Sequence, residues 1–461
     1  MNLNEQYEQI HLKVLEKVRP KKDEKELLDD TFKDVVQKLQ TILDNKKINA
    51  KIELSGSFSR DTWLSGNRDI DLFIILPYES EIEPEQLLTL IKEDFKLDWI
   101  KKHAKHPYLF AIYKGIDIEI LPCYEFQAGR NLRSAVDRTP NHMQFIKNNL
   151  QTGVNDEVRL LKQFMRGVGV YGAEIKVNGF SGYLTELLVI HNNGKFLDVL
   201  KSASKLGKDI IKFKDDLMVS SERYKDDVLI VIDPVDDSRN VASPLKENTL
   251  AKFIAAANHY LEHPSINYFL PKPIHITKEK LNKISENAFY YCGMIYKEPK
   301  ISDDILWGQI RKLERSLLKF YSSEGLNPII IDSIITNNEI MTVLITLEKT
   351  TPKYKWLIGP PPQRDIENNF LEKHKNDQNI IYGPAIIDGR WKIIARQEKL
   401  TLDKVIQKGL ESNLIVKPKN LQLKNMRVFE GKSLIKEIDG DQERMNFLYQ
   451  LLKGTPPYQQ E

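Results

Sequence analysis

The segment Asp69-Ile-Asp-Leu-Phe-Ile-Ile-Leu76 constrains the fold of this chain more than any other feature of its sequence. Its β-branched and aromatic residues, followed by Pro77, predict a buried strand. Asp69 and Asp71 lie two positions apart, so a strand presents both carboxylates on one face, close together. Two such anions repel each other unless a hard cation such as Mg²⁺ lies between them. The segment therefore predicts a sheet with an acidic, metal-binding face.

The residues around this segment predict an α/β sheet domain that ends near residue 140. Apolar residues recur at helical spacing, and short apolar runs between them have the composition of strands. The predicted helices cover residues 24–44 and 85–103, and the predicted strands cover residues 51–55, 69–76, 108–113 and 116–121. The last strand carries Asp117 and Glu119, which again share one face. If it lies beside the strand of Asp69, carboxyl oxygens from both strands converge on one point.

The rest of the chain predicts two further regions, and hence an α+β multidomain fold. Residues 141–260 are mostly helical by their periodicity, with helices over 155–169, 180–195 and 246–261 and one strand over 228–232. Beyond residue 265, a helix over 303–321 precedes strands over 329–335 and 341–347, an order typical of small α+β domains. We therefore expect domains at residues 1–140, 141–260 and 261–461.

The composition is that of a globular protein with a sizeable core. Hydrophobic residues make up 41% of the 461 residues and charged residues 29%, which excludes a disordered or fibrous chain. No apolar run is long enough for a membrane span, and the N-terminus lacks the features of a signal peptide. Cys123 and Cys292 are too few for a disulfide framework. We therefore expect a cytoplasmic protein that does not bind membranes.

The net charge of +3 hides an asymmetry along the chain. Residues 1–270 hold 38 Lys and Arg against 41 Asp and Glu, whereas residues 271–461 hold 30 against 24. The positive excess in the C-terminal part would attract a polyanionic partner. An ordinary surface of solvated lysines would give the same balance.

The dipeptide Gly56-Ser57 precedes the acidic strand and has the chemistry of a phosphate site. A glycine lets a backbone N–H approach a phosphate closely, and the serine hydroxyl can bond to the same group. Arg60 lies nearby in sequence and adds positive charge for a triphosphate. A Gly-Ser turn and an acidic pair each occur often by chance, but together with the second acidic strand they favour a nucleotide site.

Gly56-Ser57 followed by Asp69-Ile-Asp71 resembles the signature of the polymerase-β-type nucleotidyltransferase superfamily. Further blocks resemble the archaeal, class I CCA-adding enzymes. These blocks are Gly56–Leu64, Ile120–Tyr124, Ala135–His142, Glu157–Lys162, Tyr171–Glu174, Gly179–Tyr183, Asp233–Asp236 with Arg239-Asn240, Gly359-Pro-Pro, Gly383-Pro384 and Gly389-Arg390. The resemblance covers essentially the whole chain.

The resemblance implies an enzyme that adds C, C and A to the 3′ end of tRNA without a template. It would use CTP and ATP, release pyrophosphate and work by two-metal-ion nucleotidyl transfer with two Mg²⁺ ions. The implied fold is a polymerase-β-like catalytic palm (1–140), with a mixed sheet and helices, and a mainly helical nucleotide-binding domain (141–260). A C-terminal α+β body (261–461) would carry an inserted tail (about 325–400) that binds the acceptor stem and TΨC arm of tRNA. The family also implies a homodimer.

Three carboxylates fall on the family's metal and catalytic positions, namely Asp69, Asp71 and Glu119. The third acid of the family is usually aspartate, and Glu119 is one methylene longer. Glu119 would therefore need an adjusted rotamer to reach a metal, and Asp117 is a rival for the same role.

The resemblance also implies which residues bind the nucleotide. Ser57, Lys162 and Tyr171 would hold the triphosphate, as expected of a hydroxyl, an ammonium and a phenol around a polyanion. Arg239 would read the Watson–Crick edge of the incoming C or A. The full set of nucleotide-binding residues is Gly56, Ser57, Arg60, His142, Lys162, Tyr171 and Arg239.

Basic residues alternate with aromatic residues in the C-terminal region, around Trp356, Tyr382 and Trp391. This pattern suits a protein that reads the shape and backbone of A-form RNA. The residues expected to bind RNA are Lys353, Lys355, Arg390 and Lys392. For any one of them, a solvated surface position is the simpler interpretation.

Three other functions share part of this pattern. A poly(A) polymerase would have the Gly-Ser and acidic elements but not the tail blocks, and would not stop after three nucleotides. A catalytically inactive, nucleotidyltransferase-like RNA-binding protein would have lost its carboxylates. A small-molecule nucleotidyltransferase does not explain a chain of this length with a basic C-terminal part.

Overall fold

The computed structural model describes residues 2–459 except 104–105, 128–129, 135, 152, 216, 220, 273–274, 287–288 and 363–366. The chain forms two compact units, the first made of Met1–Lys272 with Pro457–Glu461 and the second of Pro273–Pro456. Within the described ranges, no helix is long and apolar enough to cross a membrane.

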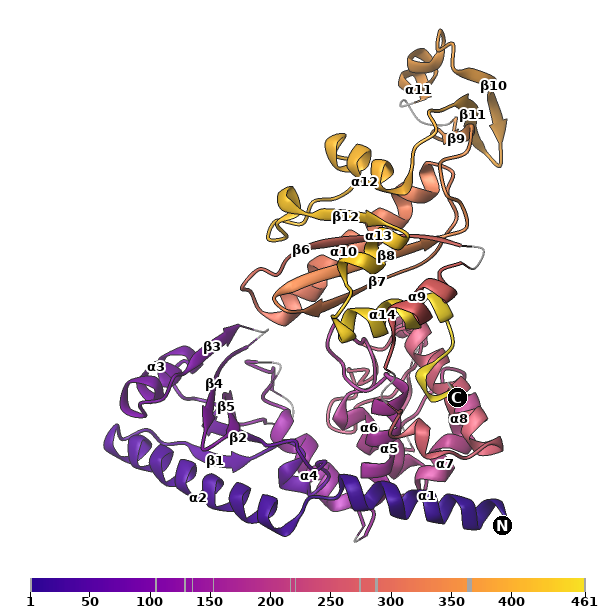
Figure 1. Ribbon diagram of the computed structural model, residues 1–461. Coiled ribbons are helices and arrows are strands. Elements are labelled where there is room, and N and C mark those ends of the chain that lie inside the picture. Colours follow the sequence, from indigo (N-terminus) through magenta and orange to yellow (C-terminus); the bar gives the residue numbers. More distant parts are fainter. Residues whose placement is uncertain are drawn as a thin grey trace. The chain divides into compact units, whose positions relative to one another are not determined.

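A mixed sheet organises the first part of the first unit (Figure 1). Its strands are β1 (Lys51–Leu54), β2 (Asp69–Leu76), β3 (Ile100–His103), β4 (Pro107–Tyr113) and β5 (Ile116–Tyr124), in the order β1-β2-β5-β4-β3. The central strands β2 and β5 are parallel, and the other pairings are antiparallel. The mixed sheet with its helices confirms the expected fold of this region.

Helices α2 (Lys22–Asn45) and α3 (Pro84–Asp94) cover one face of this sheet. Strand side chains alternate between faces, so Ile70, Leu72 and Ile118 point toward these helices and are 0% exposed. The other face of β2 and β5 carries the acidic residues. Burial of one face thus fixes which side of the sheet presents the carboxylates.

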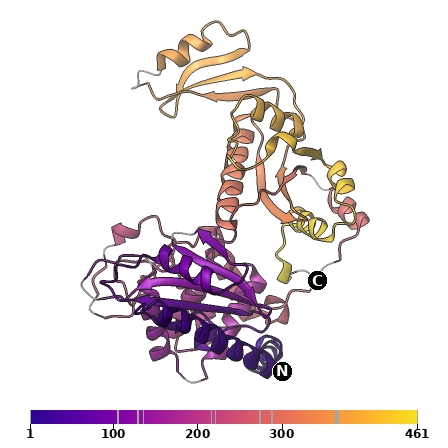
Figure 2. The ribbon, with the colours of Figure 1, turned by 90° about the vertical axis from the view of Figure 1, so that its left-hand side faces the viewer.

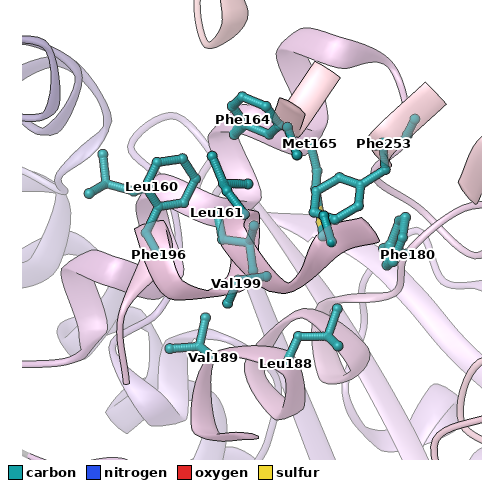
Figure 3. Packing of buried hydrophobic residues seen from close by; sticks show 14 of the residues in the cluster. Leu160, Leu161, Phe164, Met165, Phe180, Leu188, Val189, Phe196, Val199 and Phe253 are labelled. Carbon is teal, nitrogen blue, oxygen red and sulfur yellow. The ribbon is translucent and has the colours of Figure 1, made fainter. Parts of the chain in front are cut away.

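The remaining part of the first unit is helical. Its helices are α1 (Leu3–Val18), α4 (Thr139–Asn149), α5 (Asn155–Val168), α6 (Gly182–His191), α7 (Phe196–Ser202) and α8 (Glu247–Glu262). These helices share one core. Figure 3 shows part of it, in which Phe164 of α5 and Phe196 of α7 pack together and are fully buried. Because α5 is buried on several sides, its polar residues must find partners inside the protein.

The second unit is an α+β fold with helices on both faces of a sheet (Figure 2). The strands β6 (Tyr290–Lys297), β7 (Pro328–Thr336), β8 (Glu339–Thr346) and β12 (Arg427–Glu430) have the order β12-β6-β8-β7. One face packs on α10 (Asp303–Ser323) and α12 (Leu402–Glu411). The other packs on α9 (Lys278–Ile284), α13 (Lys432–Glu437) and α14 (Gln442–Lys453).

A smaller sheet is inserted between β8 and α12. It consists of β9 (Tyr354–Ile358), β10 (Ile380–Ile387) and β11 (Arg390–Arg396) in the order β10-β11-β9, with the helix α11 (Glu367–His374). Ile393 and Ala395 are buried, whereas Trp356 and Tyr382 are 47% and 51% exposed. Large aromatic side chains therefore remain exposed to solvent on this insert. We call the insert between β8 and α12 the tail.

Two predicted elements differ from the structure. The helix predicted over 85–103 ends at Asp94, and residues 100–103 form β3 instead. The run Ile100–His103 pairs with β4, which satisfies its backbone groups in the sheet. The strand predicted over 228–232 is present only as isolated bridges, from Val231 to Ile211 and from Ile232 to Asn240.

Candidate active site

Four carboxylates share the open face of the first sheet. In the parallel register of β2 and β5, Asp69 lies beside Asp117 and Asp71 lies beside Glu119. Asp69, Asp71 and Glu119 are half-buried, whereas Asp117 is exposed. The fold therefore brings the two acidic strands together as neighbours, with Glu119 next to Asp71 and Asp117 further toward solvent.

The carboxylates in this group repel one another. Burial, together with the charges of Asp69 and Glu119, raises the pKa of Asp71 to about 7. Burial also raises the pKa values of Asp69 and Glu119, with a further contribution from Asp117. Among the described residues, no three His, Cys, Asp or Glu side chains are already grouped as metal ligands. The concentrated negative charge nevertheless fits a divalent cation, which would offset the repulsion.

Gly56 lies directly against the carboxylate of Asp71. The amide of Ser55 donates a hydrogen bond of 2.8 Å to the carbonyl oxygen of Asp71, which brings the turn after β1 over β2. Gly56 has a φ of +69°, and a Cβ at this position would lie 1.9 Å from Oδ2 of Asp71. Ser57 follows and is the N-cap residue of the short 3₁₀ turn η1 (Phe58–Arg60). Only glycine leaves this space open beside the carboxylate.

Arg60 and Lys162 converge on a carboxylate that the sequence analysis did not single out, that of Glu186 on α6. Nε of Arg60 lies 2.9 Å from Oε2 of Glu186, and Nζ of Lys162 lies 3.3 Å from Oε1. Lys162 also donates hydrogen bonds to the carbonyl and hydroxyl oxygens of Thr62, at 3.1 Å and 3.0 Å. Both cations are within electrostatic range of the acidic group, Lys162 of Asp69 and Arg60 of Asp71.

Tyr171 lies at the edge of the same group. It forms an isolated bridge with Phe180, and the guanidinium of Arg166 lies 5.2 Å from the centroid of its ring. Burial raises the pKa of Tyr171 to about 12, and the nearby negative charge of Glu186 contributes to the rise. The phenol therefore remains protonated at neutral pH and can donate a hydrogen bond.

His142 and Arg239 meet at a second buried carboxylate, that of Asp233. Nη1 of Arg239 donates a 2.7 Å hydrogen bond to Oδ2 of Asp233, and Nε2 of His142 lies 2.8 Å from the same oxygen. The ring of His142 also stacks on Tyr183, with 4.4 Å between centroids. Burial alone would raise the pKa of Asp233, but His142, Arg239 and the Val235 amide lower it to about 2. Asp233 is therefore ionised and orients both side chains.

The four tail residues expected to bind RNA have different surroundings. Nζ of Lys355 lies 2.5 Å from the buried carboxylate of Glu324, and Nζ of Lys392 lies 2.6 Å from Asp388. Arg390 donates a 2.9 Å hydrogen bond to the carbonyl oxygen of Gly359. Lys353 is exposed, and its ammonium lies 5.3 Å from the centroid of the Tyr354 ring.

One face of the tail sheet combines aromatic and basic side chains. Trp356 on β9 lies opposite Ile394 on β11, which in turn lies opposite Tyr382 on β10. Arg396 and Lys392 occupy the same face of β11, because they lie two residues on either side of Ile394. Exposed aromatic rings next to cations suit contact with nucleic acid.

Sequence reasoning missed the roles of Glu186 and Asp233. Glu186 is a single charged residue inside the apolar run of α6, and Asp233 lies in the block Asp233–Asp236, which resembles the family but has no assigned role in it. A carboxylate in an apolar helix is buried only when it is paired, so this position carried a usable signal. The partners lie on other segments and were not readable from the local pattern, since Thr62 is 124 residues and Lys162 is 24 residues from Glu186.

Three regions of the chain match known protein families. Residues 35–142 match the family described as nucleotidyltransferase domain, and residues 156–270 match the second domain of tRNA nucleotidyltransferase. Residues 288–422 match the C-terminal domain of the CCA-adding enzyme. Together these matches extend over both units of the chain.

The chain is also similar to curated proteins named CCA-adding enzyme. It is 34% identical to that of Methanosarcina acetivorans, over 83% of this chain and 85% of the relative. It is 34% identical to that of Sulfurisphaera tokodaii, over 93% of this chain and 96% of the relative. Identity to that of Archaeoglobus fulgidus is 32%, with the same coverage of 93% and 96%.

Proposed function

This chain belongs to the archaeal CCA-adding enzymes and is a tRNA nucleotidyltransferase that adds CCA to tRNA, and from that premise we propose which of its residues carry out catalysis and which bind each substrate. The substrates are tRNA and nucleotides, which we take to be CTP and ATP. In each step the 3′-hydroxyl oxygen of tRNA bonds to the α-phosphorus of the nucleotide, and the bond to pyrophosphate breaks.

Asp69, Asp71 and Glu119 form the catalytic group in this proposal, and they would hold two Mg²⁺ ions. When bound, such ions favour loss of the hydroxyl proton and neutralise the charge on the departing pyrophosphate. The observation that carries the proposal is the register of β2 and β5, which places Asp71 beside Glu119. Gly56 lies against Asp71 and, having no side chain, leaves the space beside this carboxylate free. Glu119 is the third acid because it is half-buried next to Asp71, while Asp117 is exposed.

The triphosphate is held by residues around the Gly56 turn and by α5. Ser57 offers a hydroxyl, Arg60 and Lys162 offer positive charge, and Tyr171 offers a protonated phenol. These groups come from different segments of the chain that meet beside the carboxylates. The triphosphate can contact all of them only when the nucleotide lies next to Asp69 and Asp71. That placement orients the α-phosphorus toward the 3′ end of tRNA.

His142 and Arg239 act on the sugar and base of the nucleotide. Arg239 presents its guanidinium to the Watson–Crick edge while Asp233 fixes its orientation. A nucleotide with the wrong edge leaves buried donors and acceptors unpaired, which gives strong discrimination.

The second unit holds the tRNA in this proposal. The tail would contact the acceptor stem and TΨC arm through Lys353, Lys355, Arg390 and Lys392, with support from Trp356 and Tyr382. We propose that the reaction takes place in the cytoplasm and that the enzyme acts as a homodimer.

The test uses a tRNA transcript that lacks its CCA end, with Mg²⁺ and labelled CTP and ATP, singly and together. We expect two C residues and one A residue to be added, followed by arrest. An open-ended A tail would instead indicate a poly(A) polymerase, and no incorporation at all would indicate an inactive RNA-binding protein.

The third acid is tested in the same assay with Glu119→Gln and Asp117→Asn. We expect Glu119→Gln to lose at least a hundredfold in rate and Asp117→Asn to keep most of it, on the usual scale for a catalytic group. An inactive Asp117→Asn variant with an active Glu119→Gln variant would reverse the assignment.

A further inference from the structure

Glu186 lies buried at the point where the sheet and helical parts of the first unit meet. Its side chain is 0% exposed, and it belongs to a helix, α6, whose residues Leu184, Leu187 and Leu188 are also buried. An ionised carboxylate in such a place is strongly unfavourable unless opposite charges and hydrogen bonds surround it. Glu186 therefore has to be explained by its partners.

Three groups from two other segments bind this carboxylate. The hydroxyl of Thr62 donates a 2.6 Å hydrogen bond to Oε1, and Nζ of Lys162 lies 3.3 Å from the same oxygen. Nε of Arg60 lies 2.9 Å from Oε2. Thr62 and Arg60 belong to the loop that follows Gly56-Ser57, whereas Lys162 belongs to α5. Glu186 thus joins the phosphate-binding loop to the helix that carries the buried lysine.

The charges of this cluster depend on one another. Burial alone would raise the pKa of Glu186, but Arg60, Lys162 and the Thr62 hydroxyl outweigh it and lower the pKa. Burial lowers the pKa of Lys162, and the charge of Arg60 adds to that effect, whereas Glu186 opposes it. Without Glu186, the two cations would face each other with no anion between them.

We propose that Glu186 is a positioning residue that holds Arg60 and Lys162 in place for the triphosphate of the incoming nucleotide. This inference rests on the proposed function, because it takes Arg60 and Lys162 as triphosphate ligands. Two cations and one fixed anion leave a net positive charge beside Asp69 and Asp71. Glu186 contacts the cations, so its effect on the nucleotide is indirect.

A positioning role predicts a specific change in nucleotide affinity for Glu186→Gln, which keeps the shape of the side chain and removes its charge. We expect the dissociation constants of CTP and ATP, measured on the protein with Mg²⁺ and without tRNA, to rise by about tenfold. The rise should be equal for CTP and ATP, because the triphosphate is common to both. The KM for tRNA should stay unchanged.

Two further variants keep the inference testable. If Glu186→Gln does not fold, Thr62→Val removes the hydroxyl that donates to Glu186 and accepts from Lys162, without removing a charge. It should raise both nucleotide dissociation constants by about threefold. Glu314→Gln is the matched control, since Glu314 is a buried carboxylate paired with Arg311 and Ser333 in the second unit. It should leave both nucleotide dissociation constants unchanged.

The outcomes separate this inference from the proposed function. Wild-type protein that binds CTP and ATP but adds neither to tRNA would overturn the proposed function alone. Wild-type addition of CCA combined with unchanged nucleotide binding in Glu186→Gln and Thr62→Val would overturn the role of Glu186. A loss of affinity for CTP only, or for ATP only, would also overturn it, since the triphosphate would then not be the group affected.

Discussion

At the scale of single residues, the acidic group is a source of instability that a bound cation would relieve. Asp71 has a pKa of about 7, above its ordinary value, because burial and two neighbouring carboxylates disfavour its charge. The folded protein therefore binds a proton there more tightly than the unfolded chain does. The stability gained in this way is present below about pH 4 and is lost as the pH rises through 7.

We predict that the melting temperature of the metal-free protein falls between pH 5 and pH 8, and falls less in Asp71→Asn. The variant has no charge at this position, so its neighbours lose one repulsive partner. Thermal unfolding in a chelator measures the effect at each pH, and added Mg²⁺ should reduce the fall in the wild type. Equal pH dependence in both proteins would contradict this account.

Asp233 is the residue on which nucleotide selection is expected to depend. It is fully buried and accepts a hydrogen bond from Arg239, the side chain assigned to the base edge. We predict that Asp233→Asn lowers the preference for CTP over UTP by about tenfold, because Arg239 loses its fixed orientation. The ratio of kcat/KM for the two nucleotides measures this preference.

Asp237 provides the control for that variant. It forms an ion pair with Lys214, and both side chains are well exposed to solvent. Because an exposed pair contributes little, Asp237→Asn should leave the preference unchanged. A preference that stays intact in Asp233→Asn would exclude this role for Asp233.

At the scale of elements, the turn after β1 places the backbone of Gly56 directly against the carboxylate of Asp71. Gly56→Ala places a Cβ 1.9 Å from Oδ2 of Asp71 and therefore displaces the carboxylate. We predict a loss of at least a hundredfold in the rate of CCA addition, on the scale of other disrupted catalytic geometries. The backbone strain of a positive φ adds a stability cost of about 1 kcal/mol.

The turn between β4 and β5 supplies a matched control. Gly115 has a φ of +76°, and nothing lies within 4 Å of a Cβ built there. Gly115→Ala should therefore have a similar backbone cost of about 1 kcal/mol and retain activity. Denaturant unfolding measures the stability of both alanine variants, and the CCA-addition assay measures their activity. Equal activity in the two variants would show that the clash with Asp71 is unimportant.

Elements with strong local signals were predictable from the sequence. Strand β2 begins and ends at the predicted residues, because β-branched residues and the following proline define it locally. The prediction of one helix over 85–103 was wrong beyond Asp94. Residues 100–103 become a strand because β4 offers them backbone partners, and such pairing is decided by tertiary contacts.

At the scale of the whole molecule, the basic C-terminal part is expected to bind tRNA through its phosphates. We predict that the affinity for tRNA falls steeply with rising KCl. In Lys353→Ala the plot of log affinity against log salt should be shallower, its slope smaller in magnitude by about one. Lys353 is exposed on the tail beside Tyr354, so it is free to approach a phosphate. Filter binding across a salt series measures the slope.

A lysine outside the tail that also lies near a tyrosine ring serves as the control. The ammonium of Lys453 lies 5.9 Å from the centroid of the Tyr449 ring on α14. Lys453→Ala should keep the slope of the wild type. If both variants or neither changed the slope, the tail would not be a distinct RNA contact.

The sequence by itself determined the acidic strand, the Gly56-Ser57 turn that precedes it, and the family to which the chain belongs. Each depends on residue types at short spacing, which local conformational preferences translate directly into structure. Only the tertiary structure decided that Glu119 lies beside Asp71, that Glu186 pairs with Arg60 and Lys162, and that Asp233 pairs with Arg239. Thr62 and Glu186 are 124 residues apart, and Lys162 and Thr62 are 100 apart. A buried charge is stable only with partners, and folding alone brings partners so distant in sequence together.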